Sequence, residues 1–162
     1  MLDLLKDEFA GSFPTVSPMI ATVRLLGATI LGGVIGWERE IHQKPAGLRT
    51  HMLVSIAACL FITVGAQLGT MDFGATEALR IDPLRLIEAV TAGVAFLAAG
   101  LIFTSGGKVR NITTGASLWL SGAVGLACGA GQIPLALIAT IIVVAVIGGV
   151  GAMERRWPDP DD

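Results

Sequence analysis

The chain has 162 residues, 53% of them hydrophobic and 15% charged, and a formal net charge of −2. Soluble domains average about 25% charged residues, whereas the charges here gather in short polar segments between long apolar runs. This composition excludes a soluble enzyme domain, and the small net charge without a basic stripe excludes a nucleic-acid-binding protein. It predicts an all-α integral membrane protein, a bundle of about five transmembrane helices.

Five apolar segments are long enough to cross about 30 Å of hydrocarbon. The five segments lie near 18–37, 48–68, 84–104, 112–130 and 133–152. A polar N-terminal segment at 1–17 comes before them, and a short cytoplasmic tail at 153–162 follows them. Ser17-Pro18 and Asp82-Pro83 each place a capping side chain before a proline at the first helical position. Asn111 is the expected cap of the fourth helix. The short connections predict that sequential helices are antiparallel neighbours.

The basic residues predict the orientation of the bundle. Seven of them flank the first and third connections and follow the last helix: Arg39, Lys44, Arg49, Lys108, Arg110, Arg155 and Arg156. Because loops rich in Lys and Arg stay in the cytoplasm, the N-terminus is expected outside and the C-terminus inside. An odd number of spans agrees with this.

Two opposite charges lie at similar depth below the outer membrane face. Arg24 is about 9 Å into the first helix, and Glu88 has a matching depth in the third. A lone charge there costs about 2.5–3.5 kcal/mol, so the sequence predicts an intramembrane Arg24–Glu88 pair. Asp82 and Arg85 form an outer-face cluster that supplies competing partners. The pair either fixes helix register or serves an ion pathway, and the structural role is slightly favoured.

Rows of small and polar residues recur at a spacing of four. Ser55, Cys59 and Thr63 form a polar ridge in the second helix, for which hydrogen bonds between helices are favoured over a water-lined path. Small residues that favour close helix crossings form two further rows: Ala28, Gly32 and Gly36 in the first helix, and Ser117, Ser121 and Gly125 in the fourth. Packing within the bundle and packing between copies of a homo-oligomer both remain open.

Four ordered blocks carry a resemblance to a known family. They are RLL at 24–26 through GWERE at 36–40, AGLRTH at 46–51, DPLR at 82–85 with GVAFLAAG at 93–100, and VRNITTGASLW at 109–119. In this order they resemble the MgtC/SapB family of bacterial membrane proteins over roughly residues 24–152, and four ordered blocks are more specific than one motif. The chain departs from the family at Ala95 and Ala98, where the family has glycine, and at Asn111-Ile112, where it usually has Gly-Leu.

The resemblance implies a multi-pass protein of the bacterial inner membrane, linked to growth under magnesium limitation and stress and, in pathogens, to survival in macrophages. One branch is reported to restrain the rotary ATP synthase through membrane contact, so that enzyme is a partner expected by resemblance only. Many members carry a soluble domain after the last helix. Since this chain ends at Asp162, functions of that domain are not carried over.

A cytoplasmic cluster is expected where the first connection meets the start of the fourth helix, made of Glu38, Arg39, Glu40, Arg49, Asn111 and Thr114. It is either a salt-bridge cluster that anchors helix ends or a functional surface for a cation, an anionic headgroup or a partner loop. The family resemblance favours the surface. The two histidines do not argue for a zinc site, and metal binding remains unknown.

Catalysis and cofactor binding are not expected, because no nucleophile-plus-base arrangement and no phosphate loop appears in the sequence. Two functions remain. The first is a regulatory membrane factor that acts through protein contacts within the bilayer. The alternative is a transporter or channel for Mg²⁺, another cation or protons, which would use Glu88 and the polar ridge.

Overall fold

The computed structural model describes residues 16–70 and 82–156. In chain order it contains α2 (Pro18–Ile41), α3 (Leu48–Leu68), α4 (Pro83–Leu101), the strands β1 (Phe103–Ser105) and β2 (Lys108–Arg110), α5 (Ile112–Gly129) and α6 (Ile133–Arg156). In this part of the chain, 5 helices are long and apolar enough to span a membrane. The expected all-α membrane bundle is confirmed.

Two helix starts have the expected capping chemistry. The Ser17 Oγ accepts a hydrogen bond from the Ile20 amide at 3.4 Å, and the Asp82 Oδ1 accepts one from the Leu84 amide at 2.9 Å. Asn111 behaves differently from the expectation. It occupies the N-cap position of α5 with a φ of 66°, but its side chain donates to the Leu101 carbonyl at 3.1 Å. Asn111 therefore ties the start of α5 to the end of α4.

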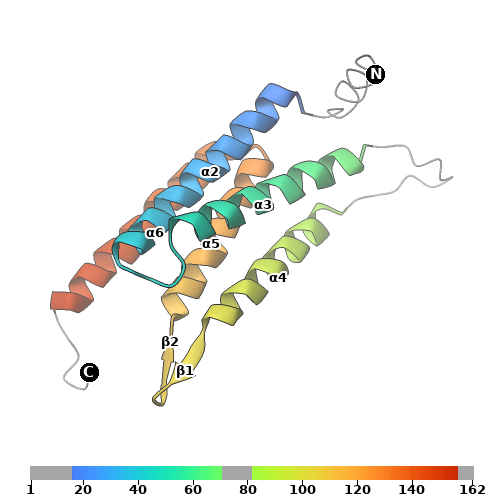
Figure 1. Ribbon diagram of the computed structural model, residues 1–162. Coiled ribbons are helices and arrows are strands. Elements are labelled where there is room, and N and C mark those ends of the chain that lie inside the picture. Colours follow the sequence, from blue (N-terminus) through green and yellow to red (C-terminus); the bar gives the residue numbers. More distant parts are fainter. Residues whose placement is uncertain (1–15, 71–81, 157–162) are drawn as a thin grey trace, which may run out of the picture.

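The third helix ends earlier than its apolar run. It stops at Leu101, and residues 103–105 pair instead with 108–110 in an antiparallel hairpin. Gly106 and Gly107 form the two-residue turn with φ values of +62° and +78°, which glycine adopts without a steric penalty. The hairpin projects beyond the helix ends (Figure 1). The expected helix end at 104 was wrong because this turn requires extended strands on both sides.

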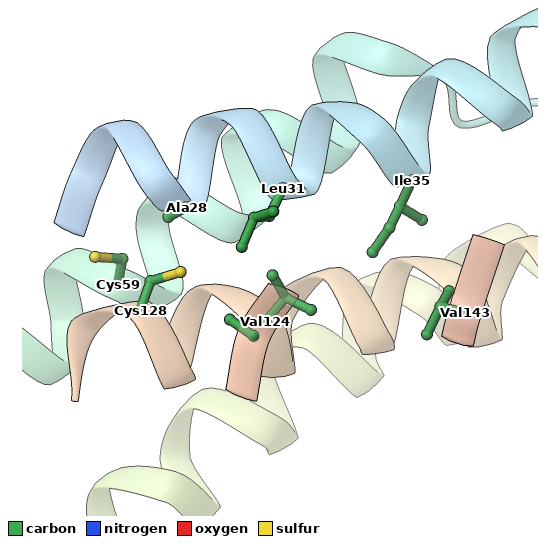
Figure 2. Close-up of a cluster of buried hydrophobic side chains, with 8 residues drawn as sticks. Ala28, Leu31, Ile35, Cys59, Val124, Cys128 and Val143 are labelled. Atoms are coloured by element: carbon green, nitrogen blue, oxygen red, sulfur yellow. The ribbon is translucent and has the colours of Figure 1, made fainter. Parts of the chain in front are cut away.

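The bundle is built around α2, α3 and α5, which pack against one another. In addition, α6 packs on α2 and α5, while α4 packs on α5 and α3 at the edge of the bundle (Figure 1). A hydrophobic cluster joins the central helices to α6 (Figure 2): Ala28, Leu31, Ile35, Cys59, Val124, Cys128, Ala136 and Val143. Both cysteines are free and buried, as packing residues would be.

Glycines allow the central helices to approach backbone to backbone. A methyl group on Gly32 would lie 2.6 Å from the Ser55 Cβ, and one on Gly36 would lie 2.8 Å from the Leu48 Cα. On α5, a methyl group on Gly125 would overlap the Ser55 carbonyl, and one on Gly129 would lie 2.6 Å from the Cys59 carbonyl oxygen. The crossings of α2 with α3 and of α3 with α5 are therefore closed to any larger side chain.

Candidate functional site

Buried polar side chains gather where α2 ends and where α3 and α5 begin. The group consists of Arg39, His51, Ser55, Thr114, Ser117 and Ser121. Burying polar groups in a membrane bundle is costly unless they form hydrogen bonds. The contacts of each side chain therefore indicate what this cluster does.

Arg39 links α2 to α5 although it is only 3% exposed. Its Nη2 donates to the Thr114 Oγ1 at 3.1 Å, and its Nη1 lies 3.6 Å from the Glu38 Oε2. The Arg39 Nε and the Glu38 Oε2 are buried and have no hydrogen-bond partner. The other carboxylate oxygen of Glu38 lies 3.0 Å from the His42 Nδ1. This buried cation is thus held mainly by one hydroxyl and one neighbouring carboxylate.

His51 links α3 to α5. Its Nδ1 lies 2.9 Å from the Gly47 carbonyl oxygen and its Nε2 lies 3.1 Å from the Ser117 Oγ, which in turn lies 2.9 Å from the Thr114 carbonyl oxygen. A carbonyl only accepts, so Nδ1 carries a proton. If the imidazole is neutral, Ser117 donates to Nε2; if it is charged, Nε2 donates and Ser117 turns to Thr114. The protonation of His51 is therefore coupled to the direction of one hydroxyl.

The polar ridge of α3 lies at the glycine crossings. Ser55 is fully buried and its Oγ has no hydrogen-bond partner, while the Thr63 hydroxyl donates to the Cys59 carbonyl within the same helix. One further bond joins the helices, from the Ser121 Oγ to the His51 carbonyl oxygen at 2.9 Å. Ser55 and Cys59 pack closely against glycines of α2 and α5. The hydrogen bonds between helices that were favoured for this ridge are not made by Ser55 or Thr63.

The structure divides the expected cytoplasmic cluster. Glu38, Arg39 and Thr114 come together, while Glu40 caps α3 by accepting from the Leu48 amide at 3.0 Å. Arg49 is exposed, and Asn111 bonds to α4 as described above. His51 and Ser117 belong to the cluster but were not assigned to it. Thr114 and Ser117 are three residues apart and therefore lie on one face of α5. This spacing could have indicated that Ser117 belongs to the cluster.

The expected pair of Arg24 and Glu88 does not form. The Arg24 Nη1 donates to the Gly129 carbonyl at 2.8 Å, at the C-terminus of α5, where unpaired carbonyls attract a cation. The helices α2 and α4 both pack against α5 but are not packed against each other. Glu88 is exposed and has no ion pair within residues 16–70 and 82–156. Asp82 caps α4, and Arg85 is exposed.

In the described ranges no group of three His, Cys, Asp or Glu residues could hold a metal ion. Glu38 and His42 lie close together, but the neighbouring Arg39 guanidinium opposes a cation there. Five membrane-spanning helices, three of which form a closed centre with a buried polar cluster, define a multi-pass helical membrane protein.

The chain belongs to the MgtC family, whose model matches residues 25–156. It is 41% identical over 122 residues to Protein MgtC of Brucella abortus (strain 2308), which covers 75% of this chain and 48% of the relative. It is 40% identical over 122 residues to Protein MgtC of Salmonella typhimurium (strain 14028s / SGSC 2262), with the same shares.

A third relative, named putative magnesium transporter YhiD in Escherichia coli (strain K12), is 34% identical over 125 residues, or 77% of this chain and 58% of the relative. The chain thus spans about half the length of the curated MgtC proteins it matches. No solved structure matches it.

Proposed function

We propose that this chain is a non-enzymatic regulatory protein of the bacterial inner membrane that serves in adaptation to magnesium limitation or stress. It acts through protein contacts within the bilayer. The observation that carries this proposal is the closed packing of α2, α3 and α5. The membership in the MgtC family supports the link to magnesium limitation.

The glycine crossings argue against a path for ions through the centre. Methyl groups on Gly32, Gly125 and Gly129 would already collide with α3, so a hydrated ion needs these helices to separate. Transporters commonly build their substrate site from discontinuous helices near the middle of the membrane. All five helices described here are continuous.

A surface for contacts within the bilayer lies on the opposite side from α6. The helices α3 and α4 enclose an apolar cavity of about 680 Å³, open to the side and lined by residues such as Phe61, Leu68, Leu86, Val90 and Leu97. A partner helix finds apolar walls there without unpaired polar groups. By family resemblance the rotary ATP synthase is a candidate partner.

The alternative function is cation transport. It is favoured by the exposed Glu88, an ionisable group within a membrane span, because such groups commonly mark ion pathways. The printed name of the Escherichia coli relative also favours it. In this alternative the path would run along the outer side of α4 and not through the central helices.

Two measurements on the full chain separate these functions. Purified protein in liposomes is tested for gradient-driven flux of magnesium, protons and potassium, with Glu88→Gln as the matched control. In parallel, the chain is expressed in a bacterium that lacks its own MgtC, and growth at low magnesium is followed. A regulator restores growth and leaves liposomes as tight as protein-free ones. Flux that requires Glu88 overturns the proposal in favour of transport.

A further inference from the structure

The two outer helices of the bundle differ in what they expose. In both α4 and α6 only 17% of the span is buried. The outward side of α6 carries large aliphatic residues, among them Ile138, Ile141 and Ile142, as expected for contact with lipid chains. The outward side of α4 also carries large residues, with Leu84 66% and Phe96 79% exposed, but beside them runs a row of exposed alanines with a carboxylate at its start.

This row, which we name the α4 outer row, consists of Arg85, Glu88, Ala92, Ala95 and Ala99, all of them exposed. Their spacing of three or four residues places them on one face of the helix. Small residues on a membrane helix permit close approach of another helix and offer little surface to lipid. Glu88 and Arg85 make no ion pair within residues 16–70 and 82–156, so no other residue in these ranges neutralises the charges on this face.

We propose that the α4 outer row packs against the same row of a second copy of this chain, around a two-fold axis along the membrane normal. Two copies inserted in the same orientation bring identical residues to the same depth. Arg85 and Glu88 differ in height by about 4.5 Å, a distance that their side chains span. Across the two-fold axis Arg85 of each copy therefore meets Glu88 of the other, and both pairs form at once.

Charge complementarity selects a second copy over other occupants. A lipid chain leaves Glu88 unpaired in the hydrocarbon, which is unfavourable. An unrelated helix needs both an acid and a base at matching depths, whereas the outer row is complementary to itself. Beyond Glu88 the row itself has only alanines, with the exposed Phe96 beside it, so the two α4 backbones can approach along the row. The inference goes beyond the proposed function, because a regulator and a transporter can carry the same interface.

Disulfide cross-linking in native membranes tests the geometry. Ala92→Cys, Ala95→Cys and Ala99→Cys are compared with two controls, Ala98→Cys and Ile142→Cys. Ala98 lies on the same helix but is 6% exposed, and Ile142 on α6 is 57% exposed. Paired cysteines must come within about 7 Å between their Cα atoms. The outer-row variants are expected to form a cross-linked band at twice the chain mass. Both controls and the parent chain, whose cysteines are buried, are expected to give no cross-linked band even though they associate.

A charge exchange tests the pairing. Arg85→Glu is expected to weaken self-association in mild detergent by about tenfold or more, and the double variant Arg85→Glu with Glu88→Arg is expected to restore it. Arg49→Glu, at the other end of the bundle, is the matched control and leaves association unchanged. The interface would be overturned if the parent chain is monomeric in detergent, or if Ala98→Cys or Ile142→Cys cross-links as well as the outer-row variants. Cross-linking to a different protein, or no recovery in the double variant, would also overturn it.

Discussion

At the scale of single residues, the bundle places its buried polar groups where one helix can satisfy another. Arg39 reaches Thr114 on α5, and His51 reaches Ser117 on the same helix. Each bond joins residues more than 60 positions apart. A hydrogen bond to a buried charged group contributes about 1.5–3 kcal/mol, and leaving one partner unsatisfied costs as much. These bonds therefore fix how α5 rotates against α2 and α3.

Replacing Thr114 tests this role. Thr114→Val keeps the shape of the side chain but removes the acceptor of the Arg39 Nη2, so we expect a loss of about 1–3 kcal/mol in stability. The measurement is thermal unfolding in a mild detergent. Thr113→Val is the matched control, since Thr113 is exposed and precedes it. Equal melting of the two variants would show that the Arg39–Thr114 bond contributes nothing.

At the scale of helices, glycine decides which pairs come close. Gly32 and Gly36 of α2 and Gly125 and Gly129 of α5 face backbone atoms at or next to the crossings with α3. By contrast, Gly93 and Gly100 of α4 have nothing within 4 Å of an added methyl group. The same residue type therefore marks a crossing on one helix and open space on another. This difference explains why α3 is central and α4 lies at the edge.

A matched pair of substitutions separates the two kinds of glycine. Gly125→Ala forces its new methyl group into the Ser55 carbonyl, and overpacking of this kind costs about 1–3 kcal/mol. Gly93→Ala meets no neighbour and gains helix propensity, so it is expected to be neutral or to stabilise by up to about 1 kcal/mol. Unfolding in detergent measures both. Similar stability of the two variants would contradict the close crossing of α3 and α5.

At the scale of the whole molecule, the two ends of the bundle differ in charge and in structure. One end holds the buried polar cluster, the hairpin and the basic residues of the first and third connections. The other end holds Arg24, which donates a hydrogen bond to the Gly129 carbonyl at the end of α5. From the positive-inside rule we predict that the first end faces the cytoplasm.

Labelling of single cysteines tests this orientation. Ser105→Cys lies in the hairpin and Thr70→Cys follows α3, and both positions are exposed. In spheroplasts a membrane-impermeant maleimide is expected to label Thr70→Cys and to spare Ser105→Cys until the membrane is permeabilised. The parent chain controls for the buried Cys59 and Cys128. Labelling in the reverse pattern would invert the topology.

Much of the fold could be predicted from the sequence because it depends on local properties. Length and hydropathy were enough to locate five spans, and the caps at Ser17 and Asp82 involve residues no more than three positions apart. The end of α4 was missed because residues 102–104 are apolar enough to continue the helix. The turn at Gly106 and Gly107 overrides that preference through pairing across the hairpin.

The candidate site was predictable only in part. Glu38, Arg39 and Thr114 were recognised as one cluster, but the contact of His51 with Ser117 depends on helix rotation. The depths of Arg24 and Glu88 were matched, yet depth does not tell which helices are neighbours. The sequence by itself determined which segments lie in lipid, because that preference is a sum over adjacent residues. The tertiary structure alone decided which polar groups meet, because the glycine crossings set the separation and rotation of distant helices.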